Sequence, residues 1–100
     1  MTMTLPPVHP GEILREEYLR PFGLSAGALA RRLNLPRTRI ERLAAEQTAV
    51  TPDTALRLAK ALGTTPEFWM NLQASHDLKI EAARHAPEID AIETIETIAA

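Results

Sequence analysis

The segment LSAGALARRLNLPRTRIERL, residues 24–43, constrains the fold more than any other part of the sequence. Ser25 is suited to cap the start of a helix, because its hydroxyl accepts a hydrogen bond from a first-turn N–H group. Asn34 tolerates the left-handed backbone of a short turn, and Ala30 is small enough for two helix backbones to approach each other. The apolar residues that would fill the wedge between them are Leu29, Leu33, Leu35, Ile40 and Leu43. The segment therefore predicts two helices that cross at a steep angle through a tight turn.

Start and stop signals divide the rest of the chain into further helices. Thr51 and Thr65 are each followed by a proline and an acid, which is the pattern of an N-cap and a first helical turn. Pro21 and Gly23 are expected to end the first helix of the chain, and Pro87 is expected to end the last. The expected helices cover residues 9–20, 25–34, 36–45, 51–62 and 65–86.

No stretch alternates apolar and polar residues between turn signals, so the predicted fold class is all-α, with five helices. These helices form one domain over residues 9–86, between a flexible N-terminal arm at 1–8 and a C-terminal tail at 87–100. The last helix would measure roughly 32 Å, whereas a domain of this size has a radius of gyration of about 13 Å. Its apolar stripe consists of Trp69, Leu72, His76, Ile80 and Ala83. Its far end is therefore expected to pack against a second copy, in a homodimer.

Composition and short motifs exclude several classes of function. The 100 residues include no cysteine, which excludes disulfides, thiolate metal sites and thiol nucleophiles. The residues MTMTLPPVHP lack the basic and apolar regions of a signal peptide, and no apolar stretch approaches the roughly 20 residues of a membrane helix, so a soluble cytoplasmic protein is expected. Because HExxH motifs, glycine-rich phosphate loops and converging carboxylates are also missing, we expect no enzyme, no cofactor and no metal site. His76 is expected to be structural.

The crossed pair of helices meets the requirements of a helix-turn-helix, whose second helix enters the major groove of DNA. There arginine can donate two hydrogen bonds to guanine, and threonine can contact the methyl group of thymine. The candidates for base contact are Arg37, Thr38, Arg39 and Arg42, with Arg39 at the border of the surface. The candidates for phosphate contact are Ser25, Arg31, Arg32, Gln47 and Thr48.

Charge is separated along the chain, although the net charge is only -2. Residues 31–42 hold five arginines and one glutamate, whereas residues 81–100 hold five acids and one arginine. Such separation suggests two faces with different partners. A solvated, arginine-rich face on an ordinary helical hairpin is the alternative for the basic segment, but the turn and packing residues of 24–43 favour DNA binding.

Three segments resemble the HigA family of antitoxins, within the Xre/Cro-type helix-turn-helix proteins: HPGEILREEYL at 9–19, GLSAGALARRLNLPRTRI at 23–40 and VTPDTALRLAKALGTTPEFWMNLQASHDL at 50–78. The resemblance covers residues 9–80, and its most specific part is TPDTALRLAKALGTTPEFWMNLQ. It implies a lambda-repressor-like fold and a dimer that neutralises a RelE/HigB-like toxin, an mRNA-cleaving ribonuclease. It also implies repression of the chain's own operon through an inverted-repeat operator, with Arg37, Thr38, Arg39 and Arg42 as recognition residues.

The chain departs from the family after the second helix of the pair. The family usually has a glycine followed by basic residues there, whereas this chain has Ala45, Glu46, Gln47 and Thr48. Glu46 is expected to face a phosphate unfavourably, while Gln47 or Thr48 can still donate a neutral hydrogen bond to the DNA backbone. Two alternatives to the autorepressing antitoxin follow: a toxin-sequestering module that has lost its affinity for the operator, and an Xre-type regulator without a toxin.

The tail repeats isoleucine every three residues, at Ile89, Ile92, Ile95 and Ile98, with acids in between. On an α-helix this spacing turns each isoleucine by about 60° from the last, so the four spread over half of the helix surface. Such an acidic and apolar segment either lies on a basic ribonuclease, or folds back on its own dimer or frays.

Overall fold

The computed structural model describes residues 7–96, and within that range the chain is all-helical, without a β-strand. Most of the expected N-terminal arm (residues 1–6), together with Ile98 and the other tail residues at 97–100, lies outside the described residues. The helices are α1 (Pro10–Ile13), the π-helical η1 (Leu14–Leu19), α2 (Arg20–Phe22), α3 (Ala26–Leu33), α4 (Arg37–Ala44), α5 (Pro52–Leu62), α6 (Pro66–Arg84) and α7 (Ala86–Asp90).

The first three elements follow one another without a break and form one N-terminal helix, residues 10–22. His9 caps it, because the ring Nδ1 accepts a hydrogen bond of 2.9 Å from the Gly11 N–H. The expectation that the helix ends at Pro21 is wrong. Pro21 lies within it, and Gly23, at φ 60°, makes the left-handed turn that ends it. The section before Pro21 is π-helical, with the Arg20 N–H bonded to the Arg15 carbonyl, a wider turn than that of an α-helix.

The crossed pair forms as predicted. Ser25 caps α3 by accepting a hydrogen bond from the Ala28 N–H, and Asn34 ends it in the left-handed conformation at φ 58°. α4 then begins after Pro36 and buries Ile40 and Leu43 against α3. The two helices share their apolar faces and leave the arginines of α4 outside.

The later helices also begin where expected, since Thr51 and Thr65 cap α5 and α6 through their hydroxyls. Gly63, at φ 70°, ends α5. The expected stop at Pro87 is wrong: α6 already ends at Arg84, and Pro87 lies in the first turn of α7, where its missing N–H costs no helical hydrogen bond. The described residues therefore hold one helix more than the five expected.

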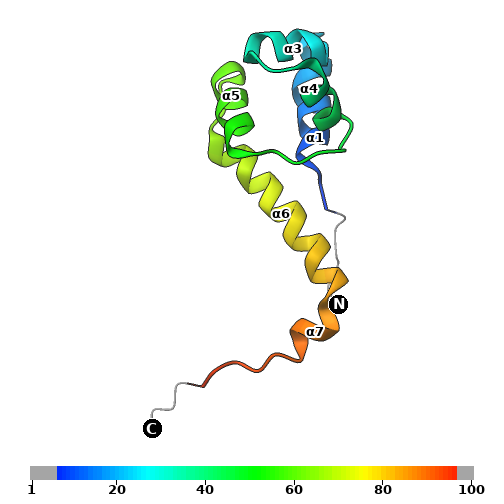
Figure 1. Ribbon diagram of the computed structural model, residues 1–100, viewed down its shortest axis with the longest axis vertical. Helices are drawn as coiled ribbons and strands as arrows, with labels where there is room; N and C mark the ends of the chain where they lie inside the picture. Colours follow the sequence, from blue (N-terminus) through cyan, green and yellow to red (C-terminus); the bar gives the residue numbers. More distant parts are fainter. Residues whose placement is uncertain (1–6, 97–100) are drawn as a thin grey trace.

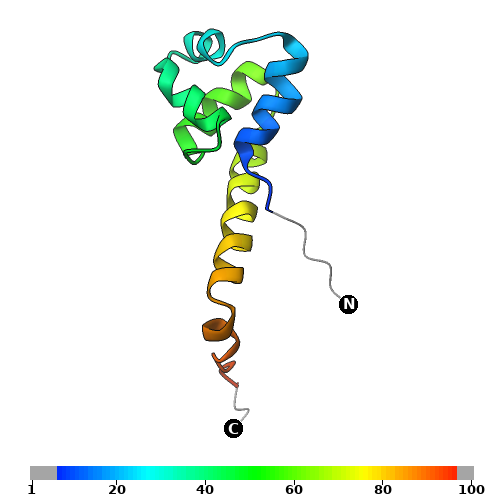
Figure 2. The same cartoon turned by 90° about the vertical axis from the view of Figure 1, so that its right-hand side faces the viewer.

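The molecule has two unlike parts, which we call the head (residues 7–73) and the distal segment (residues 74–96). The head packs the N-terminal helix, α3, α4, α5 and the start of α6 around one apolar core centred on Leu14, Leu29, Ile40, Leu58 and Trp69. α6 then continues away from the head, so the structure measures 59 × 30 × 22 Å (Figures 1 and 2). No residue of the distal segment is buried. The prediction that the head leaves the far end of α6 uncovered is confirmed, and the radius of gyration is 17.6 Å.

Candidate nucleic-acid interface

The outer face of α4 carries the residues predicted to contact bases. Its inner face is fixed by Ile40, Leu43 and Ala44, which are buried. Because a helix turns by about 100° per residue, burial of these positions leaves the others outside. The exposed side chains are Arg37, Thr38, Arg39, Glu41 and Arg42. A recognition helix needs this arrangement, with apolar contacts behind and arginines in front.

Three of these side chains border a hollow between α4 and the start of α5. Thr38, Arg39 and Arg42 line it together with Thr48 and Asp53, and its volume is about 610 Å³. Arg39 is engaged there, since its Nη1 lies 3.5 Å from an oxygen of Asp53. Among the described residues no acid pairs with Arg42, so its guanidinium faces solvent without a counter-charge. The hollow is thus lined by Arg39, which is paired with Asp53, and by Arg42, which forms no ion pair with the described residues.

A second hollow, of about 440 Å³, lies where the first turn of α3 meets the start of α4. Ser25, Gly27 and Arg31 line it from α3, and Arg37 and Glu41 line it from α4. Arg37 forms an ion pair with Glu41 one turn later, with 3.3 Å between Nε and the carboxylate. The first N–H groups of α3 and two arginines converge here, which is an arrangement suited to a phosphate beside a base.

Not all predicted phosphate contacts lie together. Ser25 and Arg31 share the hollow at the start of α3, and Thr48 lines the hollow beside α5. Arg32 instead lines a third hollow, of about 350 Å³, with Leu56, Arg57 and Lys60. Gln47 is exposed on the turn after α4. The structure therefore separates Arg32 from the other candidates.

The turn after α4 keeps the form of a glycine-capped helix end without the glycine. Glu46 adopts the left-handed conformation at φ 64°. Its N–H donates to the Leu43 carbonyl at 2.9 Å, and the Gln47 N–H donates to the Arg42 carbonyl at 2.8 Å, which is the hydrogen-bond pattern of a Schellman cap. Glutamate in this conformation costs about 1 kcal/mol more than glycine.

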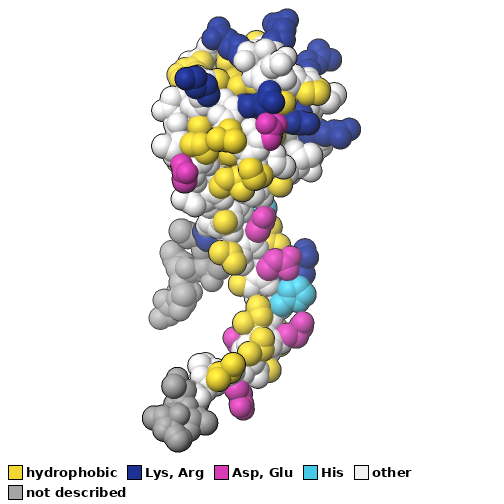
Figure 3. All heavy atoms as spheres, turned by 60° about the vertical axis from the view of Figure 1, so that its left-hand side comes forward, with side chains coloured by type: hydrophobic (Ala, Val, Ile, Leu, Met, Phe, Trp, Pro, Cys, Tyr) yellow, Lys and Arg dark blue, Asp and Glu magenta, His cyan; other side chains and the backbone are white. Residues whose placement is uncertain are grey.

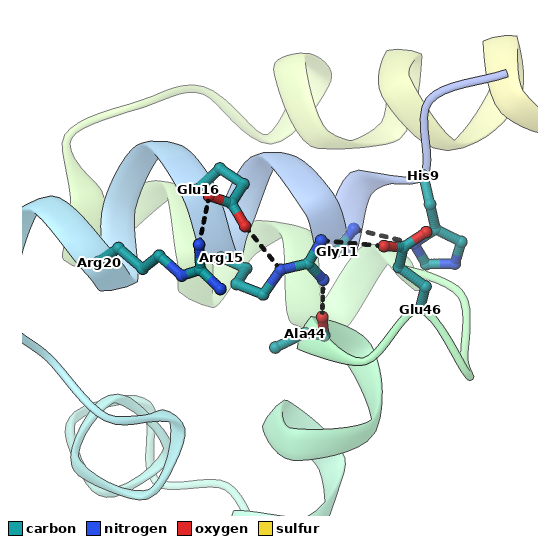
Figure 4. A network of polar contacts seen from close by, with 7 residues as sticks. All are labelled: His9, Gly11, Arg15, Glu16, Arg20, Ala44 and Glu46. Atoms are coloured by element: carbon teal, nitrogen blue, oxygen red, sulfur yellow. Dashed lines mark hydrogen bonds and ion pairs between the residues drawn. The ribbon is translucent and has the colours of Figure 1, made fainter. Parts of the chain in front are cut away.

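The charge of Glu46 is balanced from within the head (Figure 4). Arg15 of the N-terminal helix lies 3.1 Å from the Glu46 carboxylate, and it also donates to the Ala44 carbonyl and binds Glu16. Hydrogen bonds to Glu16 and Glu46 raise the pKa of Arg15 above its ordinary value. The carboxylate of Glu46 therefore joins the end of α4 to the N-terminal helix, and its unfavourable position towards a phosphate stays a prediction.

His9 and His76 join the N-terminal helix to α6, with ring centroids 4.9 Å apart and the rings nearly perpendicular. His9 is 8% exposed. Burial lowers the pKa of His9 from its ordinary value of 6.5, and the neighbouring His76 lowers it further. His76 also lies 3.2 Å from Asp77, so its role in the structure is one of packing and hydrogen bonding. Among residues 7–96, no group of three His, Cys, Asp or Glu side chains is arranged to hold a metal ion.

Three residues that position the crossed pair, α3 and α4, were not found from the sequence. Gly11 touches α4 directly, since a Cβ added there would lie 1.8 Å from the Leu43 carbonyl oxygen. Arg57 donates a hydrogen bond of 2.8 Å to the Leu33 carbonyl at the end of α3, and Arg15 holds the end of α4 as described above. Only Arg57 has a local signal, its i,i+4 spacing from Asp53, to which it is paired at 3.0 Å.

The surface view separates the two kinds of charge. Lys and Arg side chains gather over the head, whereas the distal segment shows mostly acids and hydrophobic side chains (Figure 3). Its exposed apolar residues include Leu78, Ile89, Ile92 and Ile95. No helix in the described part of the chain is both long and apolar enough to cross a membrane.

Comparison with known proteins agrees with this geometry. The family model described as Helix-turn-helix, HTH_3, matches residues 14–69. Virulence-associated protein I of Dichelobacter nodosus is 51% identical over 76 residues, which are 76% of this chain and 70% of that protein. The solved structure of Pseudomonas aeruginosa antitoxin HigA with the higBA promoter has a TM-score of 0.86 and 38% identity, and the match covers 90% of this chain and 99% of that one. The structure of antitoxin GraA in complex with its operator has a TM-score of 0.87 and 41% identity, and the match covers 97% of this chain and 99% of that one.

Proposed function

Because the chain belongs to the helix-turn-helix family and is a relative of the HigA antitoxins, we propose that it is the antitoxin of a type II toxin–antitoxin module. It acts in the cytoplasm as a homodimer that represses its own operon and neutralises a RelE/HigB-like, mRNA-cleaving toxin. The chain is not an enzyme, since its relatives are helix-turn-helix antitoxins and regulators.

The observation that carries the proposal is the outer face of α4. Arg37, Thr38 and Arg42 are exposed on it while Ile40 and Leu43 anchor the helix from behind. We assign Arg37, Thr38 and Arg42 to base edges. Arg39 reaches a base only by exchanging Asp53 for the DNA, because the two are paired at the border of this face.

The phosphate contacts are proposed on both sides of this face. Ser25 and Arg31 border the start of α3, where N–H groups of a helix N-terminus favour an anion. Thr48 and Gln47 donate from the turn after α4, and Arg32 donates from a separate place, beside Arg57 and Lys60. Contacts of this kind position the protein on the duplex without selecting its sequence.

The distal segment supports the homodimer. Leu78, Ile80 and Ile89 lie beyond the head, where no part of their own domain buries them. In a two-fold dimer on an inverted repeat, the two recognition helices would lie about 34 Å apart, one turn of DNA, so that each reads one half-site. Substitution of Leu78→Lys should raise the dissociation constant of the dimer at least about tenfold in sedimentation equilibrium, since a charge replaces a buried apolar contact.

The toxin is expected to be basic, because a ribonuclease must hold mRNA, and the acids of the distal segment complement such a surface. Co-expression with the neighbouring short, basic reading frame, followed by pull-down, tests this partner. Recovery of a stoichiometric complex is the expected result. Failure to recover it, together with tight operator binding, would make the chain a regulator without a toxin.

DNA recognition is tested by fluorescence anisotropy with the chain's own upstream region, at two salt concentrations. Arg42→Ala should cost about 1–3 kcal/mol of binding free energy and relax the preference at single base pairs. Arg31→Ala should weaken binding to all sequences alike and flatten the salt dependence. Arg84→Ala in the distal segment is the matched control, since it removes the same charge far from α4. If neither Arg42→Ala nor Arg31→Ala differs from this control, these arginines do not contact DNA, which would favour the toxin-sequestering module without operator affinity.

A further inference from the structure

The side chain of Arg37 lies against Gly27 of the neighbouring helix α3. A Cβ added at Gly27 of α3 would lie 2.9 Å from Cδ and 3.3 Å from Cγ of Arg37. The methylene chain of Arg37 therefore rests on the bare backbone of Gly27. Any side chain at this position would push it aside, because a separation of 2.9 Å is closer than carbon atoms approach each other.

Glu41 fixes the other end of the same side chain. Its carboxylate lies 3.3 Å from Nε of Arg37, on the solvent side of α4. The nearest approach of the carboxylate is to Nε, as an ion pair, and within residues 7–96 neither terminal nitrogen of Arg37 forms a hydrogen bond to another residue. Both side chains are exposed, at 72% for Arg37 and 47% for Glu41. In the free protein such a pair contributes little to stability, so its placement calls for another explanation.

The geometry of guanine recognition supplies that explanation. Arginine meets guanine by donating two hydrogen bonds, to O6 and N7. With the carboxylate of Glu41 on the Nε side, the two terminal nitrogens face away from it, and an end-on approach presents both of them to the base. The ion pair also strengthens when the groove excludes water, because the effective dielectric constant falls.

We infer that Gly27 and Glu41 are positioning residues that aim Arg37 end-on at one guanine in each half-site. This inference rests on the proposed function, in which Arg37 contacts a base. Gly27 sets where the side chain leaves α4, and Glu41 sets the direction in which its terminal nitrogens point. Together, Gly27 and Glu41 reduce the number of orientations open to Arg37, which increases its selectivity for one base.

The test measures binding to the operator and to a panel of duplexes that each carry one substituted base pair. Arg37→Ala first identifies the base pair that Arg37 reads, as the one at which discrimination disappears. Glu41→Gln keeps the shape of the side chain and removes its charge. It should lower discrimination at that base pair by roughly threefold to tenfold, while affinity for scrambled DNA rises. Glu93→Gln removes the same charge from the distal segment and should leave discrimination unchanged.

Gly27→Ala is a second variant, and it should lower discrimination without lowering stability. Alanine is favoured over glycine within a helix, so the melting temperature should stay the same or rise. Discrimination at the base pair read by Arg37 should nevertheless fall, because the new Cβ displaces the arginine. A protein that is at least as stable but less selective at one position is the expected result.

Three results would overturn the inference. If Arg37→Ala abolishes discrimination at one base pair while Glu41→Gln and Gly27→Ala preserve it, the two residues do not position Arg37, and the proposed function stands. If Glu41→Gln changes the preference at a different base pair, Glu41 reads a base of its own. If Arg37→Ala leaves discrimination intact everywhere, Arg37 reads no base, and its assignment under the proposed function fails as well.

Discussion

The head and the distal segment share one helix, α6, but differ in how they use it. Trp69, near its start, is 0% exposed and donates a hydrogen bond from its indole nitrogen to Thr64. Leu78, farther along the same helix, is 69% exposed. An apolar side chain is therefore part of the core at the start of α6, whereas an apolar side chain farther along the helix is exposed and available to a partner. Stability resides in the head, whereas the distal segment has apolar surface to offer a partner.

The two parts differ in charge in the same way. Arginines surround α4 in the head, and acids accompany the apolar residues of the distal segment. Opposite charges suit opposite partners: a polyanion such as DNA for the head, and a basic protein for the distal segment. The head and the distal segment are thus suited to different partners, and substitutions in the two parts should have different effects.

The largest contrast is expected between two substitutions in α6. Trp69→Ala should lower the free energy of unfolding by about 3–5 kcal/mol, because it opens a cavity in the core. Leu78→Ala should change it by less than about 0.5 kcal/mol at protein concentrations where the chain is monomeric. Urea denaturation measures both. Equal losses would mean that the distal segment is part of the folded core.

Gly11→Ala should come next, with a loss of about 1–3 kcal/mol, since the new Cβ overlaps the Leu43 carbonyl and forces the N-terminal helix away from α4. Alanine would otherwise favour a helix, so the sign of the effect is informative. Glu12→Ala, at the exposed neighbouring position, is the control and should be nearly neutral. Thermal denaturation of the wild type and the two variants measures these effects. A Gly11→Ala protein as stable as the control would contradict the close approach of Gly11 to α4.

A smaller effect is expected from His9. Its pKa in the folded chain lies below the ordinary value of 6.5, so the unfolded chain binds the proton more tightly. The corresponding stability is fully present above pH 6.5 and is lost as the pH falls through the folded-state pKa. His9→Asn keeps an acceptor for the Gly11 N–H but does not titrate. Its melting temperature should therefore fall less than that of the wild type on acidification; identical pH profiles would contradict the assignment.

The smallest effect concerns the turn after α4. Glu46→Gly should relieve about 1 kcal/mol of left-handed strain while losing an ion pair worth about 0.5 kcal/mol, for a slight net gain in stability. Glu46→Ala loses the same ion pair but keeps the strain, so it should be destabilised by about 0.5 kcal/mol. Chemical denaturation of the two variants compares them directly. Equal stability would show that the left-handed residue carries no strain.

The sequence predicts the parts of the head that depend on neighbouring residues. Caps at Ser25, Thr51 and Thr65, and the left-handed turn at Asn34, are local arrangements, and all four are confirmed. The predicted helix ends at Pro21 and Pro87 are wrong. A proline breaks the interior of an α-helix, but it also fits the first turn of a helix, as at Pro87, or follows a π-helical section, as at Pro21.

The contacts that position the recognition helix could not be predicted, because they join distant parts of the chain. Arg15 and Glu46 are separated by 31 residues, and Arg57 and Leu33 by 24. Gly11 gives no local sign that another helix will press against it. The proposed contact residues on α4 follow from helical periodicity, whereas the ion pairs that hold Arg37 and Arg39 depend on side-chain directions that a pattern does not specify.

The division of labour between the parts is tested most directly by the spacing of the operator. With the inverted repeat located by footprinting, about five base pairs, half a turn of DNA, are inserted between the half-sites, and anisotropy is compared with an operator whose central base pairs are merely replaced. The insertion should lower affinity to that of a single half-site, because joined distal segments hold the two heads on one side of the duplex, whereas the replacement should have little effect. Undiminished affinity after the insertion would contradict it.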